Sequence, residues 1–343
     1  SLNATSSLLN IFFILHMKDQ FVTKKILNWY DLNKRSLPWR KNVSPTKKQY
    51  FTLVSEFMLQ QTQVATVIPY FNRFIKNIPN LSSLAKTSDK KLYKLWEGLG
   101  YYSRVKNLRK TAQVVKKNFQ GKLPDTFDDL ISLPGIGNYT ASAILAIAFN
   151  KSFIPLDGNV ERVLKRYLFL KKEKEITKEN LHKKKSILGT SPRSSDYAQA
   201  LMELGALICK PTNPNCLKCP ISKKCKSFRK KDFKLVKNSK KNIDKYFILN
   251  VYKKDKKYLL VKNTKFKFLK NLRIFPMQEL SKPKKFNKTI NFKMSNMNMN
   301  IKIQYPKNVR EISSSCWVDQ KKIGNSMLPT FTKKVVKYLE GNL

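Results

Sequence analysis

The sequence predicts an all-α region followed by a smaller domain of mixed α and β structure. Apolar residues recur at three- and four-residue spacing from about residue 19 to residue 209, which is the pattern of amphipathic helices. A stretch rich in Lys, Asn and Ser then covers residues 228–245 and has the composition of a linker. Because a chain of 343 residues exceeds the usual size of one domain, two folded parts are expected.

The helical region contains seven segments with a clear helical period. They are expected at residues 49–61, 64–77, 88–95, 103–119, 139–150, 160–168 and 195–209. Between or just before them lie residues that interrupt helices, namely Pro38, Pro45, Pro79, Pro124 and Pro134. Helix is therefore the regular structure expected before the linker.

The chain after the linker has the pattern of short strands. They are expected at residues 246–252, 257–261, 291–304 and 315–318, and a closing helix is expected at 329–339. Residues 246–343 should therefore form a separate α+β domain. At the other end, the apolar run within residues 1–17 has no basic residue before it and no small-residue cleavage site after it, so it is interpreted as a disordered or extraneous extension.

The chain is strongly basic and still has the composition of a folded protein. Lys and Arg number 69 against 22 Asp and Glu, which gives a net charge of +47. Hydrophobic residues make up 41%, so a disordered basic tail is excluded and a folded polyanion-binding protein is favoured. Of the 69 basic residues 58 are Lys, as expected of an AT-rich coding sequence. Part of the positive charge is therefore attributed to codon bias. Apolar runs stay shorter than the roughly 18 residues of a membrane span, so no membrane association is expected.

Four cysteines lie within 17 residues, with the spacing C-x6-C-x2-C-x5-C: Cys209, Cys216, Cys219 and Cys225. Disulfides fit poorly in a chain without a secretory signal, and structural zinc usually takes two cysteine pairs separated by a longer stretch. A single compact loop with four thiolates favours one 4Fe-4S cluster, with zinc or an unliganded loop as the alternatives. The fifth cysteine, Cys316, is expected to be an ordinary buried thiol.

A glycine-containing turn connects two of the expected helices at residues 133–140, Leu-Pro-Gly-Ile-Gly-Asn-Tyr-Thr. Its glycines allow a tight connection whose backbone N–H groups, at Gly135, Ile136 and Gly137, face outward. Such a turn at a helix N-terminus binds phosphate without reading sequence. Asp157 follows in a Pro-Leu-Asp-Gly-Asn segment, 20 residues after Gly137.

This order of hairpin, aspartate and four-cysteine loop resembles the iron–sulfur branch of the helix-hairpin-helix DNA glycosylases. Further blocks resemble the adenine DNA glycosylase (MutY) family: LPWR at 37–40, SEFMLQQTQ at 55–63, GLGYYSR at 98–104 and MELGA at 202–206. The resemblance covers most of residues 30–226. It implies a six-helix barrel with an iron–sulfur helical domain over residues 18–227, then a Nudix-like 8-oxoguanine recognition domain. The implied activity is removal of adenine mispaired with 8-oxoguanine or guanine in duplex DNA.

Cleavage of a glycosidic bond to adenine needs two carboxylates in opposite protonation states. Glu56 lies mid-helix among apolar residues, where burial should raise its pKa and keep it protonated as the general acid. Asp157 precedes the helix that starts near residue 160, whose N-terminus favours an anion, so it should stabilise the cationic sugar or trap it covalently. By resemblance, Tyr139 and Asn159 hydrogen-bond near Asp157 and the nucleophile.

The resemblance also implies the substrate contacts. The adenine pocket would be lined by Arg35, Leu37, Trp39, Arg40 and Glu203, and the mispair would be wedged or contacted by Leu59, Gln60, Gln61 and Tyr101. The segment 272–276 resembles the family's Leu-x-x-Phe-Pro. In the loop that usually reads Phe-Ser-His, this chain has Met294, Ser295 and Asn296, so Ser295 is the one family lesion contact retained.

Two alternatives to this function remain. An endonuclease III-like glycosylase and lyase is disfavoured because Tyr139 stands where such relatives carry a Schiff-base lysine, which predicts a monofunctional enzyme. A non-catalytic DNA-binding iron–sulfur protein is disfavoured by the presence of Glu56 and Asp157. The expected partner is double-stranded DNA with A·8-oxoguanine or A·G mispairs, and a monomer in the bacterial cytoplasm, associated with the nucleoid, is expected.

Overall fold

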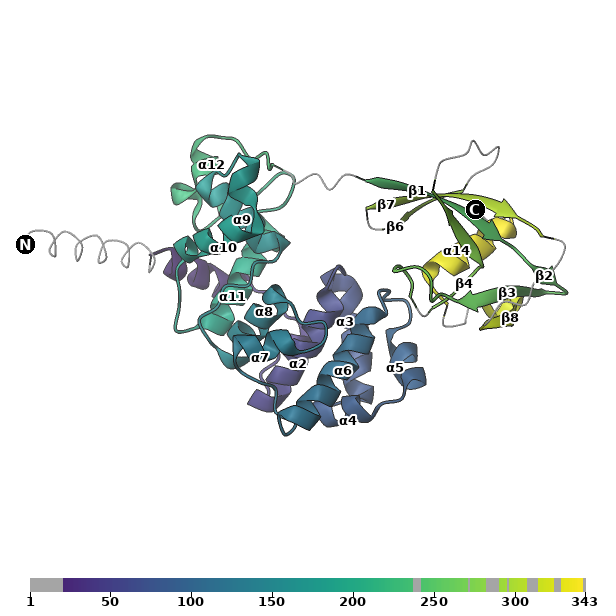
Figure 1. Ribbon diagram of the computed structural model, residues 1–343. Coiled ribbons are helices and arrows are strands. Elements are labelled where there is room, and N and C mark those ends of the chain that lie inside the picture. The colour runs from purple at the N-terminus through teal and green to yellow at the C-terminus, as the bar shows by residue number, and fades with distance from the viewer. Residues whose placement is uncertain are drawn as a thin grey trace, which may run out of the picture. The chain divides into compact units, whose positions relative to one another are not determined.

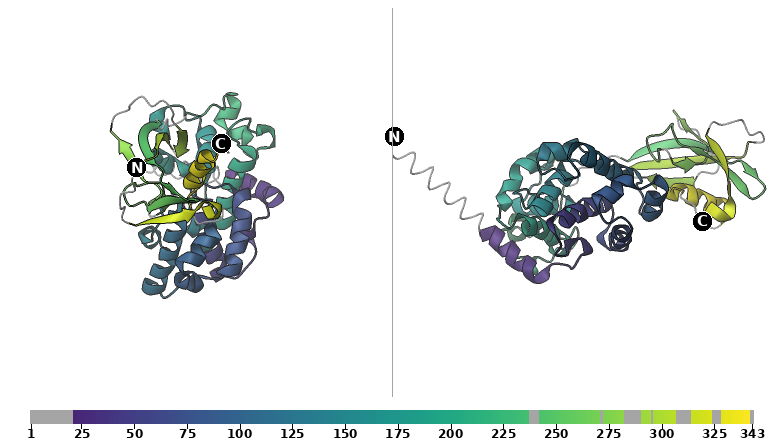
Figure 2. Two further views of the ribbon diagram at one scale, coloured as in Figure 1. Left: turned by 90° about the vertical axis from the view of Figure 1, so that its right-hand side faces the viewer. Right: turned by 90° about the horizontal axis from the view of Figure 1, so that it is seen from below.

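The computed structural model describes residues 21–236, 242–270, 272–281, 290–294, 296–306, 314–323 and 328–341. The predicted extension at residues 1–17 therefore lies outside the described residues. Contacts divide the chain into two units, one within residues 1–89 and 103–238 and the other within 90–102 and 239–343. The sequence had predicted one continuous helical region up to residue 227, so the assignment of 90–102 to the second unit differs from that prediction. In every view of the described residues, the arrows that mark strands belong to the C-terminal unit (Figures 1 and 2).

The described part of the first unit is built from helices. Residues 21–33 are helical, and the elements that follow are η1 (Pro38–Arg40), α2 (Pro45–Leu59), α3 (Val64–Asn77), α4 (Leu81–Lys86), α6 (Ser103–Asn118), α7 (Phe127–Ser132), α8 (Asn138–Phe149), α9 (Gly158–Leu168), α10 (Lys178–Lys184), α11 (Ser194–Glu203) and α12 (Lys226–Arg229). Helix α5 (Asp89–Trp96) lies almost wholly in the second unit. The seven predicted segments are helical. The short helices α4, α7 and α10 were not predicted as separate segments, because one or two turns carry little periodicity.

Helix α2 is an interior helix. Every residue from Tyr50 to Met58 is buried, so the helix has packed neighbours all round rather than along one stripe. It packs against α8, whose residues Thr140–Ala146 are also all buried. Glu56 is therefore carried into the protein interior by its helix.

Helix α11 ends earlier than predicted. The expected helix 195–209 stops at Glu203 and continues as a π-helical turn, η4 (Leu204–Ile208). Gly205 lies in this turn, and a Cβ built on it would come within 2.6 Å of Cβ of Asn159. The glycine thus allows the turn to approach the start of α9 closely, and π-helical turns of this kind are frequent at functional sites.

The second unit contains two sheets. One has the order β5-β1-β7-β6, with β1 (Ile243–Asn250) and β7 (Met297–Gln304) parallel, and β5 (Met277–Leu280) and β6 (Ile290–Met294) antiparallel to their neighbours. The other contains β2 (Lys253–Lys254), β3 (Lys257–Lys262), β4 (Arg273–Ile274) and β8 (Ser315–Asp319), followed by α13 (Gln320–Ile323) and α14 (Thr330–Leu339). One apolar core joins residues of both sheets to α14, among them Phe247, Leu260, Ile301 and Val335.

Three predictions for the C-terminal half need correction. The expected strand 291–304 is a hairpin of β6 and β7 in which Met294 pairs with Met297, because the polar residues between them favour a turn. The linker is shorter than 228–245, since the carbonyl of Phe233 accepts a hydrogen bond from Nε of Arg166 at 3.1 Å and β1 begins at Ile243. Cys316 is only half-buried, on a strand with exposed neighbours, and its Sγ accepts a hydrogen bond from Arg273.

Candidate active site

Glu56 is the carboxylate at the centre of the first unit. Its residue is only 4% exposed, and within the described residues its Oε2 is buried without a hydrogen-bond partner. Burial raises the pKa of Glu56 to about 7, helped by the nearby charge of Asp157 and opposed by a hydrogen bond with Tyr139 and by the charge of Arg40. Burial and the two carboxylates also raise the pKa of Tyr139 well above its usual value, so the phenol keeps its proton.

Asp157 caps the N-terminus of α9. Its Oδ1 accepts a hydrogen bond from the backbone N–H of Val160 at 2.7 Å, and its Oδ2 accepts one from Nδ2 of Asn159 at 2.8 Å. These donors and the charge of Arg162 lower the pKa of Asp157, but burial outweighs them, so the net direction is upward. The sequence predicted that the helix N-terminus favours the anionic form of Asp157. Burial of the site has the opposite effect, because it disfavours the charged form.

A partly buried chain of hydrogen bonds continues from Asn159 to the cysteine loop. Nη2 of Arg162 donates to Oδ1 of Asn159 at 2.6 Å and to the carbonyl of Gly205 at 2.8 Å. Nε of the same arginine donates to the carbonyl of Cys209 at 2.6 Å. One side chain therefore fixes the amide that contacts Asp157, the π-helical turn and the first cysteine of the loop.

A third carboxylate, Glu203, is bound by two arginines. Arg35 donates from Nε to Oε2 and from Nη2 to Oε1, both at 2.8 Å, and Nη2 of Arg40 lies 2.9 Å from Oε1. The Glu203 side chain is 0% exposed, whereas that of Arg35 is 35% exposed. Buried Leu37 starts the 3-10 turn that carries Arg40, and buried Trp39 packs edge-on against Phe71 at 5.4 Å between ring centroids. The residues predicted to line one pocket thus lie on neighbouring elements.

The C-terminal end of α2 presents the predicted wedge segment. Leu59 is the half-buried last residue of the helix, Gln60 is its C-cap, and exposed Gln61 has a φ of 58°. The N–H of Thr62 donates to the carbonyl of Leu59 at 3.2 Å, which closes a tight turn. Buried Arg104 reaches this turn from α6.

The hairpin between α7 and α8 is a tight glycine-containing turn. Gly135 has a φ of 82°, and a Cβ built there would come within 2.8 Å of Cβ of Asn107 and 3.0 Å of the Phe57 ring. Gly137 is the N-cap of the 12-residue helix α8. Both glycines are exposed beside the N-terminus of α8, which favours an anion. Ile136 is buried and its N–H donates to the carbonyl of Leu133 at 3.2 Å, so of the three N–H groups predicted to face outward that of Ile136 does not.

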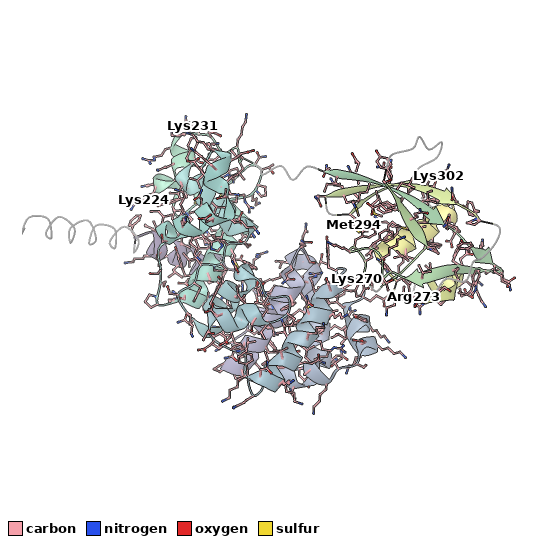
Figure 3. The ribbon with its side chains drawn as sticks, in the orientation of Figure 1. Lys224, Lys231, Lys270, Arg273, Met294 and Lys302 are labelled. Carbon is pink, nitrogen blue, oxygen red and sulfur yellow. The ribbon has the colours of Figure 1, made fainter. Side chains whose placement is uncertain are left out.

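The four clustered cysteines line one hollow. Cys209, Cys216, Cys219 and Cys225 face it together with apolar side chains such as Val163 and Ile221. Burial, reinforced by the other thiols, raises the pKa of Cys219 to about 12. Within the described residues, no group of three or more His, Cys, Asp and Glu has the geometry of a single-ion site. Exposed lysines surround the loop, Lys224 and Lys231 among them (Figure 3).

For two predicted site residues the described structure gives no position relative to these groups. Tyr101 is 53% exposed with a φ of 48°, and its segment belongs to the second unit. Ser295 lies outside the described residues. Its neighbour Met294, labelled in Figure 3, ends β6 and is half-buried. Sequence reasoning missed Arg104 and Arg162; the first ends the GLGYYSR block, and the second had no signal beyond its place in α9.

Comparisons with known proteins agree with this scaffold. A family model described as the HhH-GPD superfamily of base excision DNA repair proteins matches residues 54–186. A solved thermostable thymine-DNA glycosylase is 26% identical with a TM-score of 0.54, covering 62% of this chain and 98% of that one. An endonuclease III in a non-covalent complex with DNA shares the fold, at 21% identity and a TM-score of 0.50, covering 62% of this chain and 97% of that one. Fold and site therefore define a helix-hairpin-helix base-excision DNA repair protein.

A curated relative identifies the family within this class. The adenine DNA glycosylase of Buchnera aphidicola subsp. Schizaphis graminum is 41% identical over 258 residues, which are 73% of this chain and 73% of that one. The chain belongs to the adenine DNA glycosylases, hydrolases of N-glycosyl bonds. Within the part of the chain that the structure describes, no helix has the length and apolar character of a membrane span.

Proposed function

We propose that this glycosylase extrudes adenine mispaired with 8-oxoguanine, or with guanine, from duplex DNA and removes it by hydrolysis. The observation that carries the proposal is the pairing of a buried Glu56, whose pKa is raised to about 7, with Asp157 held by donors at the start of α9. One group can give a proton and the other can face a developing positive charge. A glycosylase that releases a neutral base needs both.

Glu56 would act first as the general acid. It donates its proton to a ring nitrogen of adenine while the bond between that base and the sugar C1′ breaks, so the base leaves neutral. Tyr139 lies within hydrogen-bonding distance of Glu56 and keeps its own proton, which fixes the direction of the carboxyl group. Water then supplies hydroxide to C1′, and its remaining proton restores Glu56.

Asp157 would face the sugar, which becomes oxocarbenium-like as the base leaves. The donors from Val160 and Asn159 hold both carboxylate oxygens, and the charge of Arg162 favours ionisation. A carboxylate positioned before the reaction stabilises a developing cation without reorganising solvent. The alternative within this mechanism is a covalent bond between Asp157 and C1′ that water later hydrolyses.

Adenine would be recognised by the paired arginines and Glu203. Adenine presents an acceptor at N7 and a donor at N6, and this cluster offers both complements. Because Glu203 is completely buried and Arg35 is partly exposed, Arg35 can turn toward the base while Arg40 still neutralises Glu203. The apolar faces of Leu37 and Trp39 would cover the ring.

The four cysteines would hold one 4Fe-4S cluster. All four thiols line one hollow. Buried Arg166 contacts Sγ of Cys209 and the carbonyl of Lys210, so it supplies positive charge beside a set of thiolates. With Cys209 and Cys225 bound to one cluster, the two ends of the 209–225 loop would be tied together, and the lysines around the loop would stay available to phosphates. Together with the α7–α8 hairpin, these lysines would give binding that is independent of sequence and weakened by salt.

The C-terminal unit would act as a Nudix-like recognition domain for 8-oxoguanine. In its sequence Met294 and Asn296 stand where the family usually has Phe and His, on either side of Ser295. Met can wedge between bases, and Asn can form a hydrogen bond with the lesion. Recognition by this loop should therefore persist in a weaker form than the family pattern would give.

The test is adenine release under single-turnover conditions from three otherwise identical duplexes, with A·8-oxoguanine, A·G or A·T. The proposal predicts release in that order, with A·T inert. Equal rates for A·8-oxoguanine and A·G would contradict lesion specificity, and release from A·T would contradict mispair specificity. Borohydride treatment should trap little protein on DNA; a trapped yield comparable to base release would contradict the monofunctional mechanism.

A further inference from the structure

Arg104 is a buried cation directed at the end of the helix that carries Glu56. The residue is 6% exposed, and it lies in the first turn of α6. Its Nη1 lies 2.7 Å from the carbonyl oxygen of Met58, 2.5 Å from that of Gln60 and 3.3 Å from that of Phe57. Oγ1 of Thr62 is 3.1 Å away. One nitrogen therefore reaches four oxygens, three before Gln61 in the sequence and one after it.

The positive charge of Arg104 is stabilised by the end of α2 and not by its own helix, α6. A cation in the first turn of α6 is disfavoured by the dipole of its own helix. The last carbonyls of α2 have no partners within their helix and form the negative end of that dipole. A buried charge needs such partners to persist, and these carbonyls supply them.

The contacts fix a segment that could otherwise adopt several conformations. Gln60 leaves the helix with a ψ of 108°, and Gln61 then takes a φ of 58°, a region that a residue with a side chain rarely occupies. Arg104 binds the carbonyls before this residue and the hydroxyl after it. The strained residue is thereby held between two anchored positions, with its side chain exposed.

We infer that Arg104 is a positioning residue that holds the Gln60–Gln61 segment in the conformation that opens the mispair and extrudes adenine. The inference rests on the proposed function, which assigns this segment to the mispair. Arg104 itself touches neither Glu56 nor the base in this scheme. Its loss should therefore slow the step that delivers adenine to the pocket, and an error of about 1 Å in such a group costs roughly 100-fold in rate.

The experiment compares Arg104→Met and Arg104→Lys with Arg109→Met. Arg109 is the matched control, because it lies on the same helix and binds Thr87 and Asp89 instead. Base release is followed under single-turnover conditions on A·8-oxoguanine duplex, recording both the rate constant and the amplitude. Extrusion is followed by the fluorescence of 2-aminopurine placed at the adenine position.

For Arg104→Met we expect a rate constant lower by about 100-fold, a reduced fluorescence rise and an unchanged amplitude. Arg104→Lys should recover part of the rate, since it keeps the charge but loses the fork. Arg109→Met should stay within about threefold of the wild type. A lower amplitude with an unchanged rate constant would overturn the inference, because that result means only that fewer molecules are folded.

Thr62→Val tests the same contact if Arg104→Met does not fold. It removes one of the four oxygens from a half-exposed position, and exposed Thr66→Val is its control. The rate constant should fall about tenfold for Thr62→Val and not for Thr66→Val; equal rates would overturn the inference. If the wild type releases adenine and all variants release it at the same rate, only the inference about Arg104 is contradicted. If the wild type does not release adenine, the proposed function is contradicted as well.

Discussion

Replacing Glu56 by Gln should stabilise the protein, and the gain should grow as the pH rises. Gln has nearly the same shape and can still accept a hydrogen bond from Tyr139, but it never becomes charged. The wild-type carboxyl group is buried, and its pKa rises from 4.5 to about 7. The substitution thus removes the cost of burying a carboxylate at neutral and alkaline pH.

The magnitude follows from linkage between protonation and folding. Because the folded pKa exceeds the unfolded one, the favourable contribution of the neutral carboxyl is fully present below pH 4.5 and is lost as the pH rises through about 7. At 1.36 kcal/mol per pH unit, the whole loss is about 3 kcal/mol. Most of it, about 2.5 kcal/mol, falls between pH 5 and pH 8.

Urea unfolding at pH 5 and pH 8 measures this difference. The free energy of unfolding of Glu56→Gln relative to the wild type should rise by about 2.5 kcal/mol between the two pH values. Glu173→Gln is the control; this exposed residue should change stability by less than about 0.5 kcal/mol at either pH. A Glu56→Gln difference that is the same at pH 5 and pH 8 would refute the reasoning, because Glu56 would then not be held as a neutral acid.

Three further predictions test the scaffold around this acid. Gly135→Ala should lower the free energy of unfolding by about 1–3 kcal/mol or more and weaken DNA binding. Gly137→Ala, where a Cβ meets nothing within 4 Å, should leave urea unfolding nearly unchanged. Similar losses for both variants would contradict the assigned turn. Glu203→Leu should lower stability by about 3–5 kcal/mol by leaving two arginines unpaired, and an unchanged melting curve would exclude that ion cluster. Arg162→Met should slow adenine release at least tenfold, because it removes the contacts to Asn159 and Cys209. Its DNA affinity, measured by fluorescence anisotropy, should stay within about threefold of the wild type. Unchanged release would show that these contacts are dispensable.

The sequence was sufficient where a feature is local. The run of apolar residues around Glu56 predicted a buried carboxyl, and the structure places it in a helix buried from Tyr50 to Met58. The Pro- and Gly-flanked Asp157 was predicted to precede a helix, and it caps α9. Such predictions succeed because burial of a helix and capping depend on neighbours within a few positions.

The sequence was insufficient where a contact joins distant segments through the backbone. Arg104 and Met58 are 46 positions apart, and the partner of the arginine is a carbonyl group that every residue has. No residue pattern marks such an acceptor. The direction of the pKa shift of Asp157 was likewise missed, since the residues next to it in the sequence predicted a helix cap but not the burial that raises the pKa. The hairpin at 290–304 was missed because both of its arms have the same polar and apolar alternation.

The pH dependence of adenine release tests the account most directly. Single-turnover rate constants on an A·8-oxoguanine duplex, measured from pH 5 to pH 9, report whether the acid must be protonated. With the pKa of Glu56 raised to about 7, the rate constant should fall as the pH rises through that value, by about tenfold per unit beyond it, and Glu56→Gln should be inactive throughout. A wild-type rate that stays constant up to pH 9, or a Glu56→Gln variant that releases adenine normally, would contradict the account.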